Sequence, residues 1–163
     1  MKKCRCEFSA FLITLALLLI LGGCATKAPV YRCSMTMEEL AEQIRSSVSF
    51  GMMMAQPAED LEAATGVKGE YFSEIAAYLP MRIGSDTLMI GKLAENVQME
   101  IVEEALKAHL DNLIKTFETY LPEAYEMAKQ GQIVHRGDYV MLVVSPDNDK
   151  AIALFEAAIQ SET

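Results

Sequence analysis

Apolar residues recur every three or four positions between Ala94 and about Tyr120, and this spacing predicts one long amphipathic helix. Val102 and Leu106 lie on the apolar side of that helix, while charged residues such as Glu103 fill the opposite side. We therefore expect Val102 and Leu106 to be buried where the helix packs against a sheet.

One helix, followed by a loop or a short helical turn, is indicated near the start of the chain. Thr36, followed three residues later by Glu39, matches a capping box, so a helix is predicted from Thr36 to Ser49. The segment from Ala58 to Val67 is predicted as a loop or a short helical turn that Gly66 ends.

Two more helices are indicated near its end. Pro122 to Gln130 begins with a proline, which the first turn of a helix tolerates, and Gly131 follows as a stop. The last helix is predicted to begin at Ser145-Pro146-Asp147, with Ser145 as the capping residue.

Two hairpins are predicted from the remaining pattern. Thr87 to Leu93 is typical of a strand, and Tyr71 to Leu79, which is ambiguous between helix and strand, is expected to pair with it. The nearly all-apolar run from Tyr139 to Val144 is typical of a central strand. It is expected to pair with residues 133–135 through a tight turn in which Gly137 supplies a positive φ angle. Together these elements predict an α+β domain with a mainly antiparallel four-stranded sheet and helices packed on one face.

The first residues of the chain are typical of an export signal. A basic start is followed by an apolar run from Phe11 to Leu21, which is shorter than the roughly 20 apolar residues that span a membrane. The run ends in Leu21-Gly22-Gly23-Cys24, which resembles the bacterial lipobox. Residues 1–23 are therefore predicted to be a signal-peptide helix that is cleaved between Gly23 and Cys24. The alternatives are an ordinary secretory signal and an uncleaved anchor helix.

The resemblance to the lipobox implies that Cys24 carries a diacylglycerol and becomes the new N-terminus. Residues 24–34 are then a short tether, and residues 35–163 form a single domain. We expect a protein that is anchored by its lipid to the extracytoplasmic face of the cell membrane.

Charge narrows the range of partners. The whole chain has a net charge of −9, and the signal peptide removes three basic residues and one acidic residue, which leaves about −11. So acidic a domain does not attract nucleic acid, and anionic lipid headgroups repel it. The lipid anchor, rather than the protein surface, is expected to hold it at the membrane.

Few side chains point to catalysis or metal binding. The only histidines are His109 and His135, and Cys33 is the one thiol left in the mature chain beside Cys24. No glycine-rich phosphate loop and no nucleophile elbow are present in the sequence. We therefore predict no catalytic residue, no metal site and no cofactor apart from the lipid. Met52, Met53 and Met54 are weak candidates for Cu(I) ligands, and adaptable packing or a surface for a partner is the alternative.

Three segments match a pattern found in known proteins: Tyr78 to Met81, the helix break from Tyr120 to Tyr125, and Gly137 to Asp147. With the lipobox, they make the chain similar to a family of small lipoproteins of low-GC Gram-positive bacteria that is catalogued as a domain of unknown function. The resemblance covers roughly residues 35–160. It implies a lipid-anchored extracytoplasmic domain and supplies no catalytic residue.

Three hypotheses for function follow. The first is a non-enzymatic binding or interaction module at the cell envelope, with a protein partner there. The second is an envelope hydrolase that uses carboxylates, which a deep pocket with close acidic groups would favour. The third is a carrier of a small ligand or a soft metal, which clustered exposed methionines would favour.

Overall fold

The computed structural model describes residues 29–162, so the predicted signal-peptide helix and the predicted lipid site at Cys24 lie outside the described residues. Along the chain the elements are β1 (Val30–Cys33), α2 (Met37–Ser47), β2 (Met53–Ala55), α3 (Ala58–Thr65), η1 (Gly69–Tyr71), β3 (Phe72–Pro80), β4 (Thr87–Leu93), α4 (Met99–Phe117), α5 (Pro122–Lys129), β5 (Gln132–Arg136), β6 (Tyr139–Val144), α6 (Asn148–Ala158) and β7 (Ile159–Glu162).

The main sheet has five antiparallel strands in the order β2-β3-β4-β6-β5. The two predicted hairpins are confirmed as β3–β4 and β5–β6, and the ambiguous segment before Pro80 is a strand. Gly137 occupies the hairpin turn with a φ of 56°. The prediction of four strands is wrong because β2, which has only three residues, joins the edge beside β3. A strand this short contains too few residues to produce a recognisable alternation.

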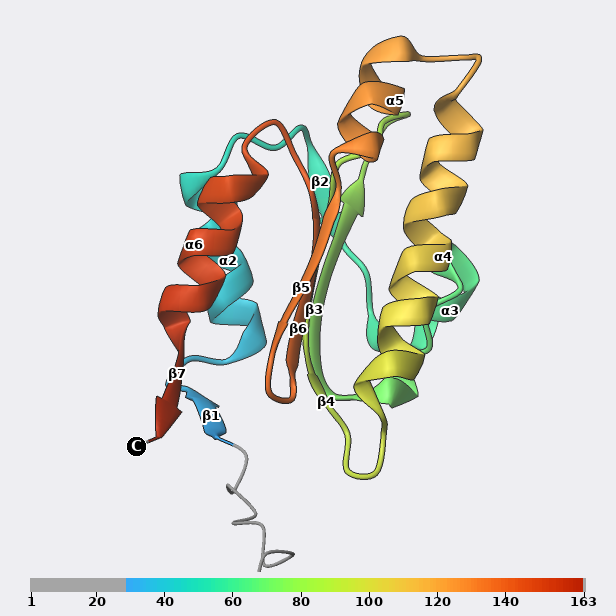
Figure 1. The fold of residues 1–163 in the computed structure, drawn as a ribbon. Coiled ribbons are helices and arrows are strands. Elements are labelled where there is room, and N and C mark those ends of the chain that lie inside the picture. Colours follow the sequence, from blue (N-terminus) through green and yellow to red (C-terminus); the bar gives the residue numbers. More distant parts are fainter. Residues whose placement is uncertain (1–28, 163) are drawn as a thin grey trace, which may run out of the picture.

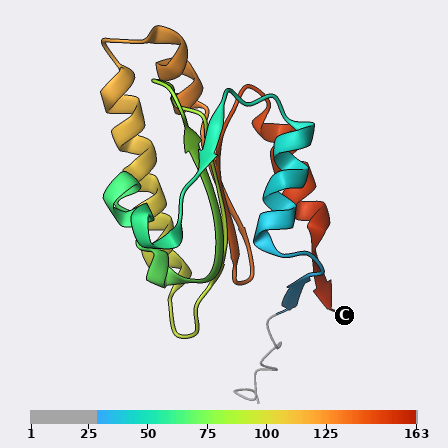
Figure 2. The same ribbon diagram turned by 180° about the vertical axis from the view of Figure 1, so that it is seen from behind.

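Helices cover both faces of the sheet, and the prediction of helices on one face is therefore wrong. In Figures 1 and 2, α2 and α6 lie on one side, and α3, α4 and α5 lie on the other. The central strand β6 shows why, since every residue in it is buried. Its alternate side chains enter two separate cores: Met141 and Val143 pack in the core with α2 and α6, and Val140 and Leu142 pack in the core with α4. A strand that is apolar on both faces requires cover on both.

Part of the predicted tether is folded. Residues 30–33 form β1, which pairs antiparallel with β7 in a separate two-stranded sheet. Tyr31 of β1 packs over the hairpin turn, where a Cβ on Gly137 would lie 2.7 Å from the Tyr31 ring. The segment predicted as a tether over 24–34 thus belongs to the domain from at least Val30 onward. The cause is a pairing between opposite ends of the sequence, which no local pattern indicates.

Helix boundaries follow local signals in most places. The capping box of Thr36 and Glu39 is present at the start of α2, and Gly66 ends α3 with a φ of 79°. The long helix begins five residues later than predicted, at Met99, because Asn96 adopts a positive φ of 68° and forms a turn. The capping residue of α6 is Asp147, whose side chain accepts a hydrogen bond from the backbone of Lys150.

The predicted cap, Ser145, is instead a buried partner of the first residue of α6. Its backbone N–H donates to Oδ1 of Asn148 at 2.8 Å, and Asn148 donates from Nδ2 to the carbonyl of Gln130 at 2.7 Å. These bonds join the end of β6, the start of α6 and the end of α5. The Ser145 hydroxyl also donates to Oδ1 of Asn148 at 3.0 Å, so both buried polar side chains have hydrogen-bond partners.

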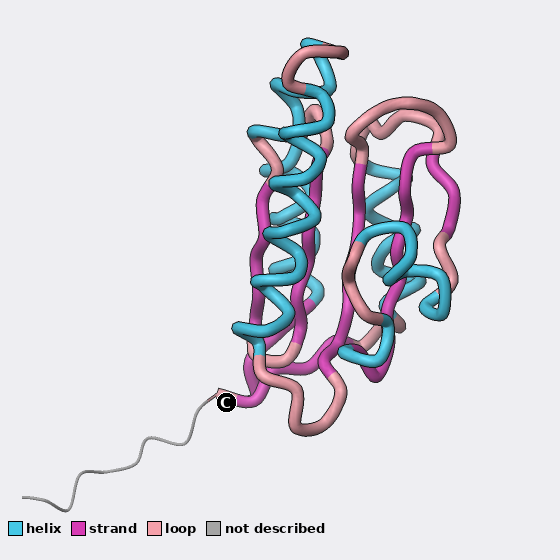
Figure 3. The backbone as a smooth tube through the Cα atoms, turned by 90° about the vertical axis from the view of Figure 1, so that its right-hand side faces the viewer, coloured by secondary structure: helices cyan, strands magenta, loops and turns pink. Residues whose placement is uncertain are grey.

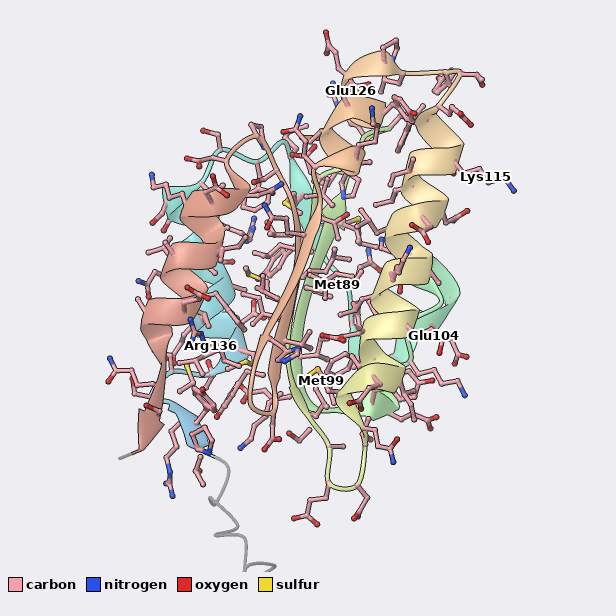
Figure 4. The ribbon with its side chains drawn as sticks, in the orientation of Figure 1. Met89, Met99, Glu104, Lys115, Glu126 and Arg136 are labelled. Carbon is pink, nitrogen blue, oxygen red and sulfur yellow. The ribbon has the colours of Figure 1, made fainter. Side chains whose placement is uncertain are left out.

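The packing of α4 agrees with the predicted burial of Val102 and Leu106, since both are almost fully buried. Ile101, one position away from Val102, is 45% exposed. Figure 4 shows Lys115 extending from α4 away from the sheet. Among residues 29–162, no helix combines the length and apolar content that crossing a membrane requires.

Candidate functional site

The three consecutive methionines do not converge on one point. Met53 is buried in the core with α2 and α6, whereas Met52 and Met54 are 58% and 48% exposed. Successive residues of a strand point to opposite faces, so Met53 is separated from its two neighbours. Only Met52 and Met54 share a face of the sheet. Within the described part of the chain, no three His, Cys, Asp or Glu side chains gather in a way that could hold a metal ion.

Met52 and Met54 belong to a larger exposed apolar surface. Met81 follows β3, and its N–H donates to the carbonyl of Met52 at 2.8 Å, so the side chains of Met52 and Met81 lie on the same face of the sheet. Met81 is 59% exposed and Ile83, in the connection from β3 to β4, is 67% exposed. We call Met52, Met54, Met81 and Ile83 the methionine patch.

The backbone beneath the methionine patch is held in place by hydrogen bonds. The N–H of Gly51 donates to Oδ1 of Asp86 at 2.9 Å, which joins the segment before β2 to the β3–β4 connection. In the same connection, the buried Ser85 donates from Oγ to the carbonyl of Ala124 in α5 at 2.8 Å. A cleft of about 280 Å³ lies here, lined by Gly51, Met52, Pro80, Arg82, Ile83, Gly84 and Asp86. The patch therefore rests on a fixed backbone, which lowers the entropic cost of binding a partner.

The two histidines lie in separate surroundings, one partly exposed and one buried. His135 lies on β5, and its Nδ1 is 2.5 Å from Oε1 of Glu103 on α4, with both side chains partly exposed. No hydroxyl or thiol is hydrogen-bonded to this pair among residues 29–162. Glu103 is far from His135 in the sequence and becomes its partner because α4 packs beside β5.

His109 is buried between α4 and the end of α3. Burial lowers the pKa of His109 below its ordinary value of 6.5, and a hydrogen bond to the backbone carbonyl of Thr65 offsets part of that effect. Its Nε2 has no hydrogen-bond partner within the described residues. The neutral imidazole is therefore the form that fits the fold.

This arrangement predicts a pH dependence of stability. Below pH 6.5 the unfolded chain binds a proton at His109 before the folded chain does, so the free energy of unfolding falls as the pH falls. Urea unfolding at pH 7.5 and 5.5 should show a smaller loss of stability for His109→Gln than for the wild type. Asn112→Gln, at an exposed position on the same helix that carries no titratable group, is the matched control and should retain the wild-type dependence. Parallel pH profiles for His109→Gln and the wild type would contradict the assignment.

A polar cluster joins α2 to β3. The hydroxyl of Tyr78 contacts carboxylates of both Glu38 and Glu42, the latter at 3.0 Å, and Arg45 stacks over the Tyr78 ring at 4.0 Å from its centroid. Burial, and then the two carboxylates, raise the pKa of Tyr78 above its ordinary value of 10. Arg45 also pairs with Glu42 at 2.5 Å. These contacts hold α2 on the sheet, and the two carboxylates lie on the surface of a helix rather than in a cleft.

A second cleft lies beside the β1–β7 ribbon. It has a volume of about 540 Å³ and is lined by residues of β1, of the segment that follows it, and of α2, α6 and β7, among them Cys33, Met35 and Leu154. Cys33 is a free thiol, and its backbone N–H donates to the hydroxyl of Tyr139 at 3.3 Å. Cys33 is thus part of the fold, where sequence reasoning placed it in a tether.

The methionine patch was only half visible in the sequence. Met52 to Met54 stand out as a run, but Met81 and Ile83 lie inside a segment whose Pro, Gly, Ser and Asp indicate a turn. Two bulky apolar side chains in an exposed turn are the signal that could have identified them, because turn residues are usually polar.

Comparison with known proteins identifies a family for this chain, but that family has no known function. A family model described as Domain of unknown function (DUF4358) matches residues 46–145, which cover β2 to β6 and the whole methionine patch. No curated protein and no solved structure matches the chain.

Proposed function

The chain belongs to the family described as Domain of unknown function (DUF4358), and from that premise we propose that it is a lipid-anchored, non-enzymatic interaction module that binds a protein partner outside the membrane. The observation that carries the proposal is the methionine patch: four apolar side chains, each about half exposed or more, on a backbone fixed by hydrogen bonds. Contiguous exposed apolar surfaces on soluble domains are typical of sites that bind other proteins.

The position of the patch supports this proposal. Figure 1 shows the β1–β7 ribbon at one end of the domain, and the start of β2 and the β3–β4 connection toward the other. A lipid on Cys24 would hold the chain six residues before Val30, a distance of at most about 20 Å. The domain would then stand on the membrane by its β1–β7 end and present the methionine patch away from the bilayer.

The chemistry of methionine also supports a partner surface. Its side chain is unbranched and polarizable, so it adapts to irregular apolar shapes and is frequent at surfaces that bind partners. Most other large apolar side chains in residues 29–162 are buried or half-buried in the two cores on either side of the sheet. The other exposed large apolar residues, Val30, Ile101 and Tyr120, lie on separate parts of the fold, whereas Met52, Met54, Met81 and Ile83 belong to β2 and the β3–β4 connection. A partner that binds there would explain why these four side chains are left in water.

A photo-crosslinking amino acid placed at Ile83 in growing cells tests the proposal. We expect one defined crosslinked partner, and we expect Met81→Glu in the same chain to reduce that product at least tenfold because a buried unpaired charge opposes docking. The matched control places the crosslinker at Ile101, which is also an exposed apolar residue but lies on α4. Equal crosslinking from both positions, or no effect of Met81→Glu at equal protein level, would refute the patch as the binding surface.

A further inference from the structure

We propose that the partner binds by adding an extended, positively charged segment to the free edge of β2, so that the main sheet gains a sixth strand. This inference rests on the proposed function and specifies the chemistry of the partner. It follows from three observations: the backbone groups that β2 leaves unpaired, the apolar side chains beside them, and the acidic helices on either side.

The backbone of β2 presents open hydrogen-bonding groups. Residues on either side of β2 are bonded toward β3. The Met52 carbonyl accepts from the N–H of Met81, which directly follows β3, and the Gln56 N–H donates to the carbonyl of Ala77 in β3. In an antiparallel ladder the bonded positions alternate, so the N–H and C=O groups of Met53 and Ala55 point away from β3. Figure 3 shows β2 at an outer edge of the sheet, next to the loop that leads into α3. An added strand would satisfy these groups.

The opposite edge of the sheet is protected by charged side chains, and β2 is not. On β5, His135 pairs with Glu103 of α4 and Arg136 pairs with Glu156 of α6 at 2.7 Å, so this edge carries charged side chains on both faces of the sheet. Charged side chains are a common means by which proteins prevent pairing at an edge strand. No salt bridge involves β2 within the described part of the chain, and Met54, in its middle, is a half-exposed apolar residue.

Charge complementarity identifies the chemistry of the segment. Residues 37–81, which include α2, β2, α3 and β3, contain eight acidic and two basic residues. The helices α2 and α3 follow the chain directly before and after β2 and lie on opposite faces of the sheet. Exposed carboxylates on α3 are Glu59, Asp60 and Glu62. On α2, Glu38 and Glu42 are exposed as well, although their oxygens also contact the Tyr78 hydroxyl. A strand added to β2 would lie between two acidic helices, so lysine or arginine side chains would be favoured on it and acidic ones opposed.

The short length of β2 sets the expected strength. Two N–H and two C=O groups allow only a few backbone hydrogen bonds, so the apolar contacts with Met52 and Met54 and the charge attraction must supply much of the affinity. Binding should therefore weaken as salt is added, because salt screens exposed charges. We expect a reversible complex rather than a permanent one.

A synthetic peptide tests the inference. The full chain, purified in detergent, is titrated into a fluorescent eight-residue peptide of alternating lysine and valine, and binding is followed by fluorescence anisotropy. We expect saturable binding that weakens at least tenfold when alternate backbone nitrogens of the peptide are methylated, since methylation removes its hydrogen-bond donors. A matched peptide of alternating glutamate and valine should show no binding. Equal binding of the methylated peptide, or of the glutamate peptide, would overturn the inference.

A variant of the protein provides the second arm. Ala55→Pro removes an outward N–H without breaking a bond to β3, and we expect it to weaken lysine peptide binding at least tenfold, whereas Ala55→Ser, which keeps the N–H, changes it less than twofold. If Ala55→Pro leaves both peptide binding and the cellular crosslink at Ile83 unchanged, strand addition is wrong while the proposed interaction surface stands. If Met81→Glu abolishes the crosslink at Ile83 but Ala55→Pro does not, strand addition is likewise wrong and the interaction surface stands. The wild-type chain could instead fail to bind the peptide and form dimers that Ala55→Pro dissociates. That result would identify a second copy of the chain as the occupant of the β2 edge and would refute a cationic partner.

Discussion

Replacing Leu106 with alanine should lower the free energy of unfolding by about 2–5 kcal/mol, as is typical when a large buried side chain is shortened and leaves a cavity. Leu106 is 1% exposed and lies in the core between α4 and the sheet, together with Val102 and Leu142. Leu142 belongs to β6, in which every residue is buried, so it has little freedom to move into the space. Urea unfolding of the purified chain, monitored by circular dichroism, measures the change.

The matched control is Ile101→Ala on the same helix. Ile101 is 45% exposed, so its truncation should change the free energy of unfolding by less than about 0.5 kcal/mol, the range typical of surface positions. A loss below that value for Leu106→Ala would show that α4 does not pack through this face. The comparison removes helix propensity from the result, because both variants introduce alanine into the interior of α4.

Replacing Cys24 with alanine should release nearly all of the protein from the membrane fraction or leave it with its leader uncleaved. On the proposed lipid anchor, each methylene buried in the bilayer contributes about 0.8 kcal/mol, and two acyl chains are needed for stable attachment. If the predicted leader is cleaved, the chain loses three basic residues and one acidic residue and its net charge becomes about −11. Such a chain would have no electrostatic attraction to anionic headgroups that could replace the lipid. Fractionation of cells followed by mass spectrometry of the mature N-terminus measures both outcomes.

Cys33→Ala is the matched control, since Cys33 is the other cysteine of the predicted mature chain. That variant should remain in the membrane fraction, because Cys33 lies in β1 and its backbone N–H, rather than its thiol, makes the bond to Tyr139. Full cleavage together with normal membrane retention in Cys24→Ala would refute the lipid anchor. Loss of retention in Cys33→Ala alone would show that the attachment had been assigned to the wrong cysteine.

The elements that sequence reasoning predicted well depend on residues close together in the chain. The strand Thr87–Leu93 has the bounds that its composition indicated, and the α2 capping box joins residues three positions apart. The turn at Gly137 and the end of α3 at Gly66 follow from the positive φ angles that glycine accepts. The burial of Val102 and Leu106 follows from helical periodicity alone.

The candidate surface could be predicted only in part for the same reason. The run Met52 to Met54 is visible in the sequence, but whether each methionine is buried or exposed depends on the strand that they enter and on its partner. Met53 is turned into a core and Met52 is placed beside Met81 by the register of β2 against β3. No pattern within residues 52–54 contains that register, because it is set by residues 78–81.

The sequence by itself determined the local elements of this protein: its main helices, its two hairpins, its turns and its acidic balance. The tertiary structure alone decided that the sheet has five strands, that helices cover both faces, and that residues 30–33 pair with residues 159–162. It also decided which apolar side chains remain in water at the edge of β2. The physical reason is that caps, turns and periodicity involve neighbours within a few residues, whereas strand pairing and burial are settled by residues far apart in the chain that compete for the same cores.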